Sequence, residues 1–124
     1  MSFNRYDIHW VDLEPVRGSE LSKTRPAVIV SLDVLNRPLE TVVVCPLTTK
    51  LHPDWRSRLQ VKVAGNLAEV AVDQVRVVSK TRLKKKLASL SDEEATALRR
   101  LLSEMYGEGC GGEESSVGKT TTQG

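Results

Sequence analysis

The sequence contains few side chains of the kinds that usually perform catalysis. It has two histidines, His9 and His52, and nothing in their spacing pairs them. A ribonuclease built on two histidines is therefore a minor alternative, and His9 is expected to be a packed or half-exposed strand residue. The sequence shows neither a glycine-rich phosphate-binding loop nor a nucleophile elbow. Other polar side chains therefore have to be considered as candidate catalytic groups.

Metal chemistry has equally little support. The carboxylates Asp12, Glu14 and Glu20 are close in sequence, but a solvated loop explains them better than a metal site. No spacing of cysteines and histidines suggests zinc. Cys45 lies in an apolar run and is predicted to be a small buried hydrophobe, while Cys110 sits among glycines. We expect no metal and no other cofactor.

Two polar residues at predicted strand ends remain as candidates, Arg25 and Thr48. Arg25 begins the second predicted strand and Thr48 ends the third, so an antiparallel hairpin would place both beside one site. The guanidinium fork can hold a phosphate with two hydrogen bonds and stabilise charge on its oxygens. A threonine hydroxyl can donate one more. From the residue types alone, an ordinary surface arginine and an ordinary strand-end threonine remain the default interpretation.

The elements that must position these two residues are short strands separated by turn signals. Alternating or continuous apolar patterns predict strands at 6–13, 25–31, 41–47, 58–63, 69–72 and 75–78. A loop of about ten residues follows the first strand, and a loop that long in a small domain is often functional. Many short strands favour a small β-barrel over a parallel sheet.

One helix is predicted after the strands. Ser91 and Glu94 form a capping box, and an apolar stripe follows at Leu98, Leu101, Leu102 and Met105. Gly107 is a suitable stop. The following residues are rich in Gly, Ser and Thr and bury too little apolar surface to fold. We therefore divide the chain into a folded domain, 1–107, and a disordered tail, 108–124.

Composition limits the possible classes of protein. The chain has 124 residues, 40% of them hydrophobic, and a net charge of +2. The segment from residue 107 carries three acidic and one basic side chain, which leaves the first 106 residues at +4 and permits a polyanionic partner. A chain this short gains stability by oligomerising. Without an apolar leader or a membrane-spanning stretch, the cytoplasm is the expected location.

Five segments together resemble the MazF/PemK family of toxins over about residues 5–106. Each is weak alone, but their order and spacing form a strong signal; they are residues 7–15, 17–20, 24–31, 44–49 and 73–78. The resemblance implies an SH3-like β-barrel with a C-terminal helix, usually a homodimer. It also implies the toxin of a type II toxin–antitoxin system, a metal-independent endoribonuclease that cuts single-stranded mRNA at short sequences. The products would be 2′,3′-cyclic phosphate and 5′-hydroxyl ends.

The resemblance also implies roles for individual residues. Arg25 of the Arg-Pro motif and Thr48 of the Pro-Leu-Thr motif would be catalytic. The residues expected to contact RNA are Ser19, Glu20, Thr49, Lys50, Trp55 and Gln74. Trp55 could stack on a base or simply pack on the barrel. Two departures from the family pattern are Tyr6, where relatives usually have glycine, and Lys50, where they often have glutamine.

The expected mechanism uses the 2′-hydroxyl of the RNA as its nucleophile. The protein then has only to align this group with phosphorus and stabilise the charged transition state. Unpaired bases can splay into pockets and stack, which would account for single-strand selectivity. Arginine is effectively always protonated, so Arg25 is assigned as electrostatic stabiliser and possible acid, and the base is left open. The sequence does not indicate which RNA sequence is recognised.

Several alternatives stay open. A CcdB-like, gyrase-binding toxin on the same fold is the main one, although a gyrase binder has no chemical need for Arg25 and Thr48. An inactive nucleic-acid-binding module is a third interpretation. The basic run at 80–86 is expected to be a solvated face, with phosphate binding or antitoxin docking as less favoured roles. A nuclease toxin also implies a MazE-like antitoxin, whose disordered tail would cover the RNA groove.

Overall fold

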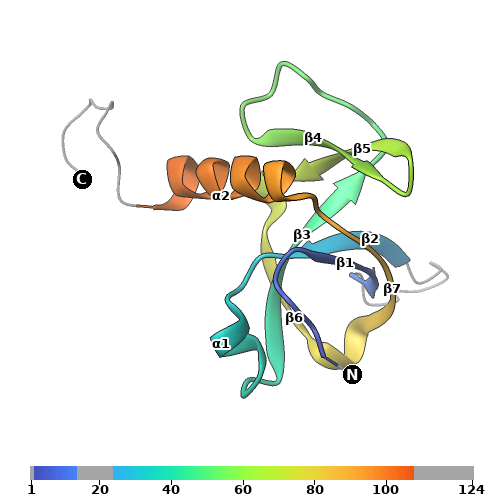
Figure 1. Ribbon diagram of the computed structural model, residues 1–124, viewed down its shortest axis with the longest axis vertical. Coiled ribbons are helices and arrows are strands. Elements are labelled where there is room, and N and C mark those ends of the chain that lie inside the picture. Colours follow the sequence, from blue (N-terminus) through green and yellow to red (C-terminus); the bar gives the residue numbers. More distant parts are fainter. Residues whose placement is uncertain (1, 14–23, 108–124) are drawn as a thin grey trace, which may run out of the picture.

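The computed structural model describes residues 2–13 and 24–107. Residues 14–23, which make up all but the last residue of the predicted loop, and the predicted tail at 108–124 lie outside the described residues. The elements in chain order are β1 (Asp7–Asp12), β2 (Thr24–Ile29), α1 (Asp33–Asn36), β3 (Thr41–Thr48), β4 (Arg58–Val63), β5 (Asn66–Ala71), a 3-10 turn (Val72–Gln74), β6 (Arg76–Ser79), a second 3-10 turn (Lys80–Arg82), β7 (Leu83–Ser89) and α2 (Asp92–Tyr106), as Figure 1 shows.

The valine-rich strand β3 is the centre of the sheet. It pairs with β2 along its middle, with β6 at its start and with β5 at its end, and every pairing is antiparallel. The strand order is β4-β5-β3-β2-β1-β7, with β6 attached to β3. This sheet curls into a half-barrel (Figure 1). The prediction of a mainly β fold with a small barrel and a C-terminal helix is confirmed.

Each face of the sheet carries its own apolar core. Helix α2 lies beside β4 and β5 in Figure 1 and covers one face, where Leu98 is fully buried among strand residues such as Val28 and Val70. The predicted capping box is present: Ser91 Oγ accepts from the Glu94 amide, and Glu94 Oε1 accepts from the Ser91 amide. No helix in the described parts of the chain is long and apolar enough to span a membrane.

Helix α1 and strand β7 were not predicted, and β5 spans Asn66–Ala71 where the prediction was 69–72. Helix α1 lies in the connection between β2 and β3, and its buried Asn36 forms hydrogen bonds with Ser31. Strand β7 was not predicted, because three consecutive lysines, 84–86, hide the alternation of its apolar residues. The pairing of β7 with β1 also contains register shifts, which break a regular two-residue pattern. The lysines themselves are exposed, as expected for a solvated face.

Candidate active site

Cross-strand pairing places Arg25 and Thr48 in one row of side chains. The last β2–β3 pair is Ala27 with Pro46, and Arg25 and Thr48 each lie two residues beyond it, where both line one cavity. The row extends on both sides, because Arg25 pairs with Val11 and Thr48 pairs with Glu69. Direct cross-strand partners point to the same face of a sheet. The sequence prediction that the hairpin brings Arg25 and Thr48 together agrees with this arrangement.

A cavity of about 420 Å³ opens beside this row. Its polar lining consists mostly of cationic and hydrogen-bonding side chains, namely Arg25, Thr48, Lys50, His52, Arg58, Gln74 and Arg76. Apolar walls are supplied by Leu13, Pro46, Leu47 and Ala71. A cavity of this size with convergent cationic groups suits a phosphate-bearing ligand.

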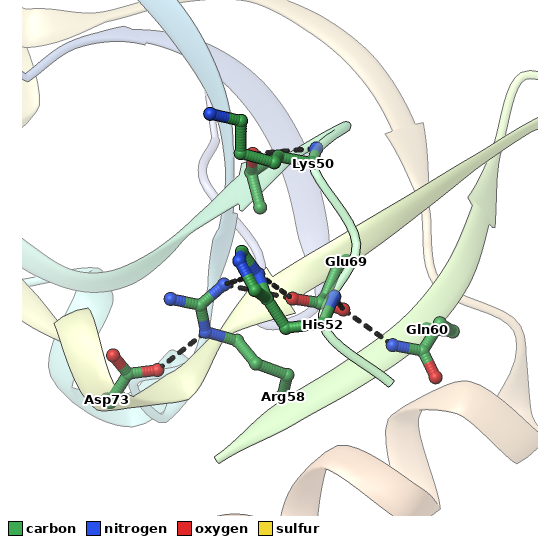
Figure 2. A network of polar contacts seen from close by, with 7 residues as sticks. Lys50, His52, Arg58, Gln60, Glu69 and Asp73 are labelled. Atoms are coloured by element: carbon green, nitrogen blue, oxygen red, sulfur yellow. Dashed lines mark hydrogen bonds and ion pairs between the residues drawn. The ribbon is translucent and has the colours of Figure 1, made fainter. Parts of the chain in front are cut away.

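The carboxylate of Glu69 lies beneath these groups and is completely buried. Oε1 accepts hydrogen bonds from the His52 amide and from Gln60 Nε2, both at 2.6 Å. Oε2 accepts from Arg58 Nη1 at 2.9 Å, as Figure 2 shows. Burial opposes ionisation of Glu69, but these hydrogen bonds, the one from the His52 amide first, outweigh it and hold its pKa below the usual range.

Arg58 is held between two carboxylates. Its Nε donates to Asp73 Oδ1 at 2.8 Å while its Nη1 donates to Glu69, and its side chain is only 6% exposed (Figure 2). The hydrogen bond to Asp73 is the largest cause that raises the Arg58 pKa. Burial works against ionisation of Asp73, yet hydrogen bonds from Arg58 and Ser57 lower its pKa. The guanidinium is therefore fixed in one orientation at the cavity wall.

His52 and Trp55 form a stacked pair in the connection between β3 and β4. Their ring centroids lie 3.9 Å apart with an interplanar angle of 21°. Trp55 also lies against the Arg58 guanidinium at 4.6 Å, yet it remains 48% exposed. Trp55 thus packs against His52 and Arg58 while about half of its surface stays exposed, and its stacking on a base stays a prediction.

The comparisons with known proteins identify the family. Residues 4–106 match the family described as "PemK-like, MazF-like toxin of type II toxin-antitoxin system". The chain belongs to this family. It is 33% identical over 97 residues to Endoribonuclease MazF of Staphylococcus saprophyticus, a match that covers 72% of this chain and 78% of the relative. The family match favours the nuclease-toxin interpretation over the CcdB-like alternative.

Solved structures of PemK-like and MazF-like toxins share the fold. A MazE–MazF structure from Deinococcus radiodurans superimposes with a TM-score of 0.73 at 20% identity and covers 86% of this chain and 96% of its own. An endoribonuclease in complex with its cognate antitoxin from a mycobacterial species gives 0.71 at 21% identity, with coverages of 84% and 94%. At these identities the likeness establishes the architecture alone.

The structure groups only some of the predicted site residues. Lys50 and Gln74 line the cavity with Arg25 and Thr48. Thr49 instead lines a second, more apolar cavity of about 260 Å³, which Thr48 also borders. Trp55 lies outside the lining of both cavities. Ser19 and Glu20 lie outside the described residues.

Sequence reasoning missed the buried network of Glu69, Arg58 and Asp73. Its one sequence signal is a glutamate in the middle of the apolar run at 67–72.

The two histidines lie in different environments. His9 on β1 is 1% exposed, and its Nδ1 is hydrogen-bonded to the Lys84 carbonyl, whereas His52 lines the cavity. Burial raises the pKa of the Cys45 thiol to about 12, so this cysteine is inert. Among the described residues, no group of three or more His, Cys, Asp or Glu side chains could hold a metal ion.

Proposed function

We propose that this toxin is an endoribonuclease that cleaves single-stranded mRNA at short sequences without a metal ion. The observation that carries the proposal is that Arg25 and Thr48, from neighbouring strands, line one cavity with cationic walls. The curated relative at 33% identity is named an endoribonuclease, which supports the same activity here. The 2′-hydroxyl would attack phosphorus, so the products would be a 2′,3′-cyclic phosphate and a 5′-hydroxyl.

Arg25 and Thr48 would stabilise the charge that develops on the phosphate oxygens. Arg25 is exposed at the cavity and its planar fork can hold two of these oxygens. Thr48 Oγ1 accepts a hydrogen bond from the Lys50 amide at 3.1 Å. A hydroxyl has one proton besides its lone pairs, so accepting this bond leaves the proton available for donation to a non-bridging oxygen.

The RNA chain would continue from the cavity across neighbouring groups. Lys50 and Gln74 would contact the nucleotide in the cavity, and Thr49 and the half-exposed Trp55 would contact its neighbours. Stacking on an aromatic ring requires unpaired bases, which accounts for the single-strand preference. Ser19 and Glu20 complete the proposed RNA-binding set.

The proposed assembly is a cytoplasmic homodimer that is inhibited by a MazE-like antitoxin. Solved relatives of the same fold are described as complexes with an antitoxin, which supports the pairing. An antitoxin segment that covers the cationic cavity would exclude RNA by occupying its phosphate site. Co-purification with the product of a neighbouring gene should therefore abolish RNA cleavage, and unchanged cleavage would contradict this part of the proposal.

Cleavage of a long single-stranded RNA in EDTA tests the activity. Wild-type protein should cut at selected sites and leave 5′-hydroxyl ends, while Arg25→Ala and Thr48→Ala should each lose about 10²–10³-fold in rate. Arg99→Ala, on the exposed side of α2, is the matched control and should cut normally. Failure of folded wild-type protein to cut would overturn the proposal. Cutting that survives both cavity substitutions would show that the active site lies elsewhere.

A further inference from the structure

Arg58 determines which nitrogen of the His52 imidazole carries the proton. Arg58 Nη1 and His52 Nδ1 form a hydrogen bond of 3.3 Å. A guanidinium has donors and no acceptor, so Nδ1 has to be the acceptor of this bond. A protonated Nδ1 could not accept it. The contact therefore requires a neutral ring that carries its single proton on Nε2, where the N–H is a hydrogen-bond donor.

The Glu69 carboxylate does not compete with Arg58 for Nδ1. Its Oε2 lies 3.5 Å from Nδ1, farther than Arg58, and already accepts from Arg58 Nη1 at 2.9 Å. Its Oε1 accepts from the His52 backbone amide at 2.6 Å. Glu69 thus holds both the backbone of His52 and the guanidinium that faces its ring, which fixes the position of the imidazole relative to β5.

The edge of the imidazole that carries Nε2 is the part left for a ligand. Arg58 occupies Nδ1 (Figure 2), and Trp55 stacks on one face of the ring. The His52 side chain is nonetheless 29% exposed and lines the cavity of about 420 Å³. Within the described parts of the chain, no acceptor is hydrogen-bonded to Nε2. The Nε2 proton is therefore available to an acceptor that enters the cavity.

The charges of the cavity indicate that this acceptor is an anionic oxygen. Arg25, Lys50, Arg58 and Arg76 line the same cavity as His52, and their cationic groups attract a phosphate. The cation at Nδ1 also polarises the imidazole, which strengthens Nε2–H as a donor. A neutral N–H adds a directed hydrogen bond without placing a further positive charge among these four cations.

We propose that His52 is a further catalytic residue, whose Nε2–H donates a hydrogen bond to a non-bridging oxygen of the scissile phosphate. The inference rests on the proposed endoribonuclease activity. The hydrogen bond strengthens as negative charge grows on this oxygen in the transition state, so it accelerates cleavage in the same way as a donor in an oxyanion hole. His52 neither takes up nor releases a proton in this role.

Substitutions of His52 separate its donor from its ring. His52→Phe keeps an aromatic ring for Trp55 but removes Nε2–H, so the rate at one mapped site should fall about 10²-fold. His52→Gln carries an amide nitrogen as many bonds from Cα as Nε2 is, and should stay within about tenfold of wild type. His52→Asn is the matched control, because its amide nitrogen is closer to Cα and should leave the rate as low as in His52→Phe. Circular dichroism confirms that the variants are folded.

A phosphorothioate tests the contact itself. In a short RNA with one mapped site, sulfur replaces either the pro-Rp or the pro-Sp oxygen of the scissile phosphate. Sulfur accepts a hydrogen bond from N–H more weakly than oxygen does, so it should slow wild type. At one of the two positions this slowing should be smaller in His52→Phe, because the donor that contacts the atom is gone. Sulfur at the next phosphate along the RNA is the control and should affect both proteins equally.

The outcomes distinguish this inference from the activity on which it rests. A smaller effect of sulfur in His52→Phe is a result that a purely structural histidine would not produce. A wild-type enzyme that needs Arg25, with the same rate and the same sulfur effects in His52→Phe, would overturn the inference alone. A wild-type protein that cuts no RNA would overturn the proposed function itself.

Discussion

One face of the sheet has an apolar end and a polar end, built from the same strands. At the apolar end, Ala27 and Ile29 of β2 pack against Val42 and Val44 of β3, and all four are buried. At the polar end the same faces carry Arg25 and Thr48, only two to six residues away. Strand geometry is continuous between them, so the packed end determines where the two polar side chains lie.

The two ends also differ in what burial does to stability. Burying aliphatic side chains stabilises the fold in proportion to the apolar area removed from water. Burying the Glu69–Arg58 pair removes two charges from water, and their attraction compensates only while both partners are present. The polar end is therefore stable only while both partners of its buried ion pair are present. The apolar end is stabilised by aliphatic side chains that each contribute separately.

The largest effect is expected from breaking the buried pair. Arg58→Met leaves the Glu69 carboxylate buried without its cationic partner, and should lower the free energy of unfolding by about 3–5 kcal/mol. Urea denaturation measures this loss. Arg56→Met is the matched control, because that side chain is 93% exposed and should change stability by less than about 0.5 kcal/mol. Equal losses of stability in the two variants would show that breaking the buried pair is not the cause of the loss.

A smaller effect is expected from acid. The pKa values of Glu69 and Asp73 are lowered in the folded state, so both contribute stability above the ordinary glutamate value of 4.5. That contribution is lost as pH falls through the lowered values. The urea midpoint should therefore drop in acid, and drop less in Glu69→Gln. Protonation leaves a carboxyl group that can still accept hydrogen bonds, so the loss should be below that of Arg58→Met. Identical pH dependence of the urea midpoint in wild type and Glu69→Gln would contradict the assignment of this stability to the Glu69 carboxylate.

The smallest effect is expected at the apolar end. Ile29→Val removes one buried methylene group and should lower the free energy of unfolding by about 0.5–1.5 kcal/mol. The rate of RNA cleavage measured well below the unfolding temperature should be unchanged, since Ile29 does not line the cavity. A fall in cleavage that parallels the loss of stability would show that the two ends are coupled.

Local patterns were sufficient to predict most of the fold. The capping box at Ser91 and the stripe through Leu98 predicted α2, and apolar alternation predicted β4 with its observed bounds. Strand β7 was missed because its lysines and register shifts remove the alternation that identifies a strand. Helix α1 was missed because a four-residue helix has no periodicity to detect.

The candidate site was predicted only where local pairing determines it. A hairpin between adjacent strands brings Arg25 to Thr48, so the sequence contains that relationship. The contacts of Glu69 with His52 and Arg58 span 17 and 11 residues and depend on how β4, β5 and the preceding connection meet. No spacing rule links residues across such a connection, and a lone glutamate in an apolar strand indicates only that a partner is required.

The hydrogen bond from the His52 amide to Glu69 has a consequence for how substrate preference can evolve. A backbone amide is supplied by every amino acid except proline, so this attachment places almost no demand on the sequence of the connection. Residues 53, 54 and 56 can therefore diversify under selection while the connection stays attached at the same point. A library randomised at 53, 54 and 56 would be a direct route to variants with altered cutting sites on an unaltered barrel.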